Sequence, residues 1–177
     1  MIERESLVFR DILTYGHPTL HNRAEPVKVF GAELKKLADE MYEAMYRAEG
    51  VGLAAPQVNV PLLFLIMSVP RDKDEPLRMV MANPRIVETR GQWEYEEGCL
   101  SVPEIRDMVV RPEWIRVEYQ DIEGKAQSFE ADGLLARVIQ HEIDHTNGVL
   151  FVDRLTLARR IRWESDLKKL ARDAARA

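Results

Sequence analysis

The chain has 177 residues, 46% hydrophobic and 31% charged, and we expect residues 1–177 to form a single globular domain. Its net charge of −5 argues against nucleic-acid binding, and no apolar run approaches the ~20 residues of a membrane span, so neither partner is expected. Residues 1–6 show no signal or transit pattern, and the single cysteine cannot form an internal disulfide, which together indicate a cytoplasmic protein.

The first half of the chain predicts one helix followed by buried strands. Apolar residues recur at helical spacing over residues 32–49, and Gly50 marks the end of that helix. Apolar runs at residues 62–68 and 78–82 predict two buried strands, and the polar segment 71–76 between them predicts a turn.

The second half predicts a hairpin and then a helix. Alternating residues at 114–120 predict a half-buried strand, and Gly124 marks a turn to another strand at 125–130. Asp132 can cap the helix that follows, and Gly148 can end it. This helix carries the motif from which we infer function.

A last helix is expected over residues 157–174. Trp163, Leu167, Leu170 and Ala174 share one face of it, and acidic residues interleave with its basic ones, which indicates a solvated opposite face. The predicted fold class is α+β, with antiparallel strands packed around the preceding helix and this helix at the C-terminal end.

The most informative stretch is His-Glu-Ile-Asp-His at residues 141–145. One helical turn is 3.6 residues, so His141 and His145 lie on the same face and can reach one metal ion. Glu142 lies about 100° around the helix from His141, near enough to touch a metal-bound water without ligating the metal. These three residues continue the apolar face, and burying such groups costs several kcal/mol unless a partner such as a metal compensates.

A catalytic metal site of this kind needs a third protein ligand. Downstream, no histidine follows His145, and Glu164 is an acid inside a strongly charged helix. Upstream, Cys99 offers a thiolate, and a thiolate with two imidazoles suits Fe(II), Co, Ni or Zn rather than Mg or Ca. A buried free cysteine is the structural alternative for Cys99.

Three short motifs stand in order along the chain. They are Gly-Val-Gly-Leu-Ala-Ala-Pro-Gln at 50–57, Glu-Gly-Cys-Leu-Ser at 97–101 and His-Glu-Ile-Asp-His at 141–145. Together they resemble the defining motifs of the peptide deformylases, and the similarity extends from about residue 12 to about residue 155. The resemblance implies a bacterial, cytoplasmic hydrolase that removes the formyl group from the N-terminal formylmethionine of newly made polypeptides, near the ribosome.

The resemblance also implies a metal cofactor. Cys99, His141 and His145 would hold one divalent transition metal, with water in the fourth position. Fe(II) is the metal expected in the cell, and Zn, Ni or Co can take its place in preparations.

The remaining motif residues gain roles from the same resemblance. Glu142 would take a proton from the water and deliver it to the leaving amine. The Gln57 amide and the Leu100 backbone N–H would stabilise the negative charge that builds on the carbonyl oxygen. The peptide would lie along residues 50–52 as an added strand, and its methionine in an apolar pocket on the inward face of the motif helix. The residues expected to contact the substrate are Gly50, Val51, Gly52, Glu97, Arg106, Leu134 and Val138.

Two other functions fit the pentapeptide. A zinc endopeptidase would use Glu164 as its third ligand in place of Cys99. A structural metal site in a binding module would be closed by a fourth protein ligand. Every catalytic position of the resembled family is present, which favours the deformylase.

Overall fold

The computed structural model describes residues 11–71 and 74–176. Residues 1–6, and residues 72 and 73 of the expected turn, lie outside this part of the chain. Three short 3-10 helices are η1 (Pro18–His21), η2 (Ala55–Val58) and η3 (Phe151–Arg154). The other elements are α1 (Ala32–Arg47), β1 (Gly52–Ala54), β2 (Phe64–Val69), β3 (Leu77–Arg90), β4 (Trp93–Cys99), β5 (Val102–Arg111), β6 (Trp114–Gln120), β7 (Ala126–Asp132), α2 (Gly133–Thr146), α3 (Leu157–Arg162) and α4 (Glu164–Ala174).

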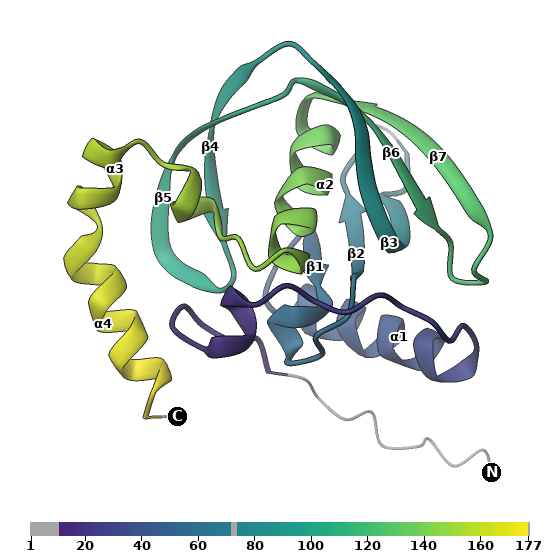
Figure 1. The fold of residues 1–177 in the computed structure, drawn as a ribbon, viewed down its shortest axis with the longest axis horizontal. Helices are drawn as coiled ribbons and strands as arrows, with labels where there is room; N and C mark the ends of the chain where they lie inside the picture. Colours follow the sequence, from purple (N-terminus) through teal and green to yellow (C-terminus); the bar gives the residue numbers. More distant parts are fainter. Residues whose placement is uncertain (1–10, 72–73, 177) are drawn as a thin grey trace.

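The strands form an antiparallel five-stranded sheet, in the order β1-β2-β3-β6-β7, and a separate hairpin of β4 and β5. Register pairs such as Ile66 with Val80 and Val117 with Phe129 align the neighbouring strands. Helix α2 contacts β1, β2, β6 and β7, and Figure 1 shows it between the sheet and the hairpin. The predicted α+β class is confirmed, and the helix with the pentapeptide occupies the middle of the molecule.

Strand β2 is buried on both faces, which explains its nearly continuous apolar sequence. Phe64 and Ile66 pack in one core cluster with α1, whereas Leu65 and Met67 pack in a second cluster with α2. Successive side chains of a strand point to opposite faces, so this one strand holds the two helices on opposite sides of the sheet. Full burial of a side chain of this size contributes roughly 1.5–3 kcal/mol.

The structure departs from the sequence prediction mainly where strands are short or polar. The patterning predicts neither β1, which has three residues, nor β4 and β5. Most side chains of β4 are exposed or half-buried, so the strand lacks the apolar alternation that would reveal it. Strand β3 also runs well past the predicted 78–82. Its outer half is only partly buried, so it lacks the apolar run from which the strand was predicted. Helix α1 ends at Arg47, before the predicted residue 49.

The helix expected over residues 157–174 is two helices that meet at Trp163. The indole Nε1 of Trp163 donates a hydrogen bond of 2.8 Å to Asp107 on β5, and Arg159 pairs with the same carboxylate at 2.5 Å. The break between the two helices therefore lies at the contact that ties this end of the chain to the hairpin. Helical periodicity in the sequence gives no information about such a tertiary contact.

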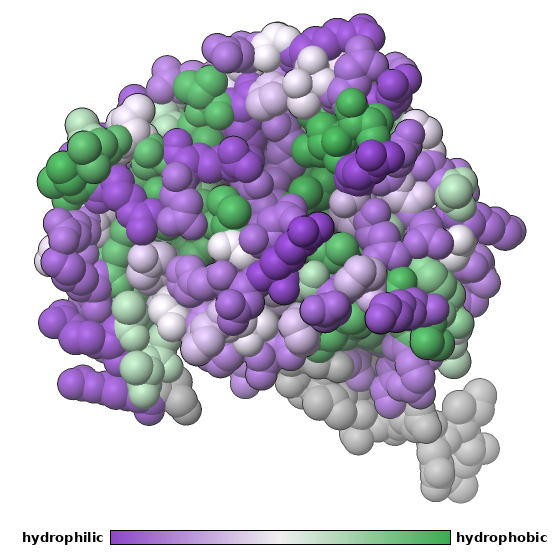
Figure 2. Space-filling view, in the orientation of Figure 1, coloured by the Kyte–Doolittle hydropathy of each residue, from purple (hydrophilic) through white to green (hydrophobic). Residues whose placement is uncertain are grey.

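Leu167 is the buried residue of α4, and it packs with Val102, Ile105 and Phe151. On α3, by contrast, Leu157 and Ile161 are exposed, and Figure 2 shows apolar surface at this edge of the molecule beside charged side chains. Within the described ranges, no helix is both long enough and apolar enough to cross a membrane.

Replacing Leu167 by alanine should lower the free energy of unfolding by about 2–5 kcal/mol, because the buried side chain that anchors α4 is lost. Leu157→Ala is the matched control: Leu157 is 76% exposed, and its loss should change stability by less than about 0.5 kcal/mol. Urea unfolding followed by circular dichroism measures both. Similar losses in the two variants would contradict the anchoring role of Leu167.

Candidate metal centre and active site

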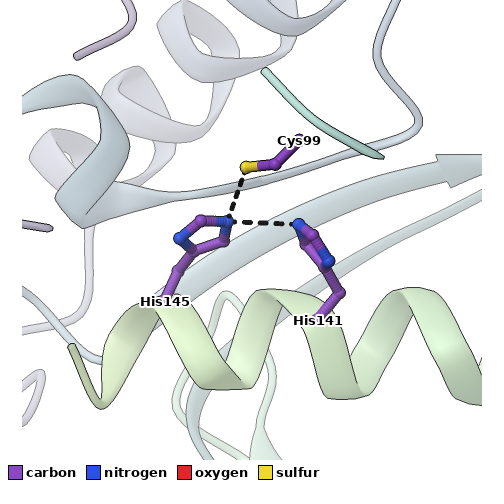
Figure 3. Close-up of side chains that lie close together, drawn as sticks. All are labelled: Cys99, His141 and His145. Carbon is purple, nitrogen blue, oxygen red and sulfur yellow. Dashed lines mark hydrogen bonds between the residues drawn. The ribbon is translucent and has the colours of Figure 1, made fainter. Parts of the chain in front are cut away.

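Two helical turns and the end of a strand bring three metal-ligand atoms together. His141 and His145 rise from the same face of α2 toward Cys99, the last residue of β4 (Figure 3). His145 Nε2 lies 3.2 Å from Cys99 Sγ and 3.2 Å from His141 Nε2. All three ligand atoms lie within 4.8 Å of one another. The structure thus gathers the three residues that the sequence predicted as metal ligands.

The spacing of these atoms fits a metal ion. Two nitrogens at the usual distance from a tetrahedral zinc-like ion lie roughly 3.3 Å apart, and a sulfur ligand lies roughly 3.6 Å from each nitrogen. The two separations of 3.2 Å in the structure are close to these values. In the described part of the chain this is the group of three such residues that could hold a metal, and no fourth ligand closes it as a structural site would require.

Glu164, the alternative third ligand, lies elsewhere. It is on α4 and pairs with Lys168 at 2.5 Å, with both side chains more than half exposed. The predicted solvated role of this residue is confirmed.

Glu97 orients His141 through Nδ1, the ring nitrogen that is not in the ligand group. Its buried carboxylate lies 3.0 Å from His141 Nδ1, so the ring donates through Nδ1–H and leaves the Nε2 lone pair for a metal. Arg111 forms a two-point ion pair with Glu97 at 2.6 and 2.9 Å, and Arg137 adds a further bond. Burial acts to raise the pKa of Glu97, but the hydrogen bonds from Arg111 and His141 outweigh it and hold that pKa well below its usual range.

Arg111 extends the network along α2 to Asp144. Its guanidinium is almost fully buried and lies 2.7 Å from Asp144, which also pairs with Arg154 near η3. Sequence reasoning did not identify Arg111 as part of the site. Its contact with Glu97, 14 residues earlier, depends on the β4–β5 hairpin, which the patterning does not predict.

The surroundings of the two histidines shift their pKa values in opposite directions. Burial and the neighbouring His141 lower the pKa of His145 well below its usual value, so this ring is neutral. Burial also acts to lower the pKa of His141, but hydrogen bonds with Cys99 and Glu97 raise it well above the usual value.

Glu142 is the second carboxylate of the site, and it is buried. It is 5% exposed, and its Oε2 atom is buried with no hydrogen-bond partner among the described residues. Burial raises its pKa from 4.5 to about 7, against the lowering effect of His141 and Arg111. A carboxyl group poised near neutral pH is suited to accept a proton and then give it back.

Gln57 is fixed beside the cysteine. Its Oε1 accepts a hydrogen bond of 2.8 Å from the Ala54 backbone N–H, so its Nε2 faces the other way. That nitrogen donates to Ser101 Oγ at 3.1 Å and lies 3.8 Å from Cys99 Sγ. Leu100 follows Cys99 in the turn between β4 and β5. Both of the predicted charge-stabilising groups are therefore next to the ligand set.

A pocket of about 510 Å³ opens over these groups, lined by Cys99, His141 and Glu142 among others. Leu134 was expected on the inward face of α2 but is 47% exposed, whereas Val138 is buried. Every residue predicted to contact the substrate lines the pocket, which also includes Tyr95 and Arg137, absent from the prediction. The predicted members are Gly50, Val51, Gly52, Glu97, Arg106, Leu134 and Val138.

An inward-facing His-Glu-x-x-His helix, a third ligand from a strand and a glutamate beside them define a metal-dependent hydrolase. The sequence model of the polypeptide deformylase family matches residues 9–160. A peptide deformylase of Chromobacterium violaceum is 50% identical over 159 residues, which cover 90% of this chain and 94% of the relative. The chain therefore belongs to the polypeptide deformylase family, whose members are metal-dependent enzymes that remove formyl groups from peptides.

Solved structures agree with this assignment. The peptide deformylase of Legionella pneumophila superimposes with a TM-score of 0.84 at 44% identity and covers 96% of this chain and 99% of its own. The peptide deformylase of Thermus thermophilus gives a TM-score of 0.86 at 41% identity, with 94% and 99% covered. The family and the enzymatic activity predicted from the three motifs are confirmed, as is the α+β fold class.

Arg111→Met should lower the free energy of unfolding, because Glu97 and Asp144 lose the cation that they share. Removing one partner of a buried ion pair costs about 3–5 kcal/mol, and we expect a value near the lower end because Arg137 and Arg154 remain. Chemical unfolding at neutral pH measures the loss.

The matched control is Arg85→Met. Arg85 forms an exposed pair with Glu118 at 2.7 Å, and losing it should cost less than about 1 kcal/mol. If the two variants were equally stable, the buried network would not hold the hairpin on α2.

Proposed function

We propose that this chain removes the formyl group from N-formylmethionyl nascent peptides in the bacterial cytoplasm, as one catalytic domain. The observation that carries the proposal is the buried Glu142 carboxyl beside the converging Cys99, His141 and His145 in one pocket. The family assignment supplies the reaction class. Work close to the ribosome follows from the nascent nature of the substrate.

In this proposal Cys99, His141 and His145 hold one divalent transition metal. One thiolate and two imidazoles are ligands preferred by Fe(II), Co, Ni and Zn, and Fe(II) is the metal that we propose for the cell. When bound there, such an ion supplies Lewis acidity, which lowers the pKa of water toward neutrality. The Nδ1 contact of His141 with Glu97 supports the assignment, since it keeps Nε2 free and directed at the site.

Glu142 moves the protons. As the carboxylate, it accepts one proton from the attacking water while the oxygen of that water bonds to the formyl carbon. It then delivers this proton to the peptide nitrogen as the C–N bond breaks, so the products are formate and a free amino terminus. A pKa of about 7 supports both steps, because neither protonation state is strongly favoured at neutral pH.

Gln57 Nε2 and the Leu100 backbone N–H are the groups we assign to the carbonyl oxygen as negative charge builds on it. The fixed amide of Gln57 supports this role, because Ala54 sets which end of the amide faces Cys99. A pre-oriented donor needs no reorganisation during the reaction, and one such donor typically lowers the barrier by about 3–4 kcal/mol.

The substrate peptide would pair with β1. This strand is at the edge of the five-stranded sheet, so one side of it has backbone groups available for an added strand. Val51, Leu134 and Val138 lie at the pocket and would surround the methionine side chain, with Arg106 at the rim. A half-exposed Leu134 supports this role better than the core packing that helical periodicity alone would give it.

Glu142→Ala should lower kcat for formyl-methionyl peptides by about 10²–10⁴-fold while the bound metal is retained, because it removes the proton carrier and no ligand. Formate release and metal analysis of the same sample measure the two effects. Glu164→Ala is the control and should change neither quantity, since Glu164 is exposed on α4. Metal loss in Glu164→Ala would instead favour an endopeptidase site.

Cys99→Ser should weaken metal binding at least about tenfold, because a hard, protonated hydroxyl replaces a soft thiolate. Competition with a chelator under anaerobic conditions gives the affinity for Fe(II), Co(II) and Zn(II). An unchanged affinity would remove Cys99 from the ligand set.

A further inference from the structure

The backbone conformation of Gly52 does not require a glycine at this position. Gly52 pairs with Met67 in an ordinary antiparallel ladder, and its backbone is outside the positive-φ region that other residues avoid. The reason for the glycine lies in its surroundings. A Cβ atom at position 52 would lie 2.5 Å from Glu142 Oε1 and 2.9 Å from both Cδ and Cγ of Glu142.

The missing side chain of Gly52 thus makes room for the catalytic carboxyl group. The glycines of residues 50–52 were expected to allow close approach of the peptide. At Gly52, however, the space that a Cβ would fill is already taken by Glu142. At Gly50 the corresponding space is next to Leu100 Cδ1, at 2.7 Å. Both glycines make way for side chains of the protein itself.

The carboxyl group of Glu142 lacks the arginine ion pairs that hold Glu97. Its Oε2 is buried and has no hydrogen-bond partner in the described part of the chain. Glu97, which lines the same pocket, is held by Arg111, Arg137 and His141. A carboxyl group without such partners takes its position from the atoms that it touches, and the space that a Cβ at Gly52 would fill is taken by Oε1, Cδ and Cγ of Glu142.

We propose that Gly52 is a positioning residue for Glu142: the absence of a Cβ at this place on β1 sets where the proton-carrying carboxyl group lies. This proposal rests on the acid/base role given to Glu142 above. Gly52 then affects kcat through the position of Glu142, independently of any contact between β1 and the substrate.

The expected effect follows from the distances. Ordinary contact with a Cβ begins at 3.4 Å, so Glu142 Oε1 must move by about 0.9 Å from its present 2.5 Å if residue 52 becomes alanine. The atoms in the way are Oε1, Cδ and Cγ of Glu142, and none of them belongs to the backbone, so we expect the Glu142 side chain to move rather than the strand. A misplacement of about 1 Å in a reacting group lowers the rate by about 10²-fold.

The test is a double-mutant cycle of Gly52→Ala and Glu142→Ala, with kcat, KM and metal content measured for all four proteins. Gly52→Ala alone should lower kcat about 100-fold, change KM by less than about threefold and retain the metal. In the Glu142→Ala background the same change should have almost no effect, because the displaced carboxyl group is already gone. A crystal structure of Gly52→Ala should show the Glu142 carboxyl group moved.

Four results would overturn the proposal. An increase in KM with kcat unchanged would mean that Gly52 acts on peptide binding. An equal loss of kcat in both backgrounds, or loss of metal, would mean that Gly52 supports the fold rather than Glu142. A crystal structure of Gly52→Ala in which the Glu142 carboxyl group has not moved would also overturn the proposal. The acid/base role itself fails on a different result, namely full activity of Glu142→Ala.

Discussion

The carboxylate of Glu97 joins the three parts of the molecule that make the site. It belongs to β4, it is bonded to Arg111 of β5 and Arg137 of α2, and it accepts the Nδ1–H of His141. A charge buried this deeply is tolerated only when its partners surround it, so the hairpin cannot slide along α2 without leaving ions unpaired. Cys99 ends the same strand, and its distance to the histidines is therefore fixed by ion pairs outside the ligand set.

The surroundings of Glu97 and Glu142 shift the pKa values of these two glutamates in opposite directions. Glu97 has arginines on its carboxylate, and its pKa lies well below the usual range. Glu142 is buried and has an unpartnered oxygen among the described residues, and burial raises its pKa to about 7. Environments that separate the pKa values of neighbouring acids also separate their roles. Glu97 remains a permanent anion that orients a ligand, whereas Glu142 can change its protonation state during a reaction.

The elements that could be predicted from the sequence are those whose signal is local. The strand Trp114–Gln120 has a clear alternation, and the spacing of His141 and His145 follows from helical geometry, so both were predicted correctly. Cys99 required the order of three motifs, since spacing alone left Glu164 open. Arg111 could not be found, because its partners are set by the fold of a polar hairpin with no periodic pattern.

The difference between hydrogen bonding and packing explains why these two glutamates are held differently. Donors on Glu142 like those on Glu97 would fix its position well, but they would also stabilise the anion and lower its pKa. A carboxylate held in that way accepts a proton poorly and cannot carry it to a leaving amine. The space left by the missing Cβ of Gly52 can set the position of the carboxyl group without stabilising either protonation state. An acid/base residue that must be both placed and titratable near pH 7 is therefore better placed by shape, and a glycine opposite it provides that shape at no electrostatic cost.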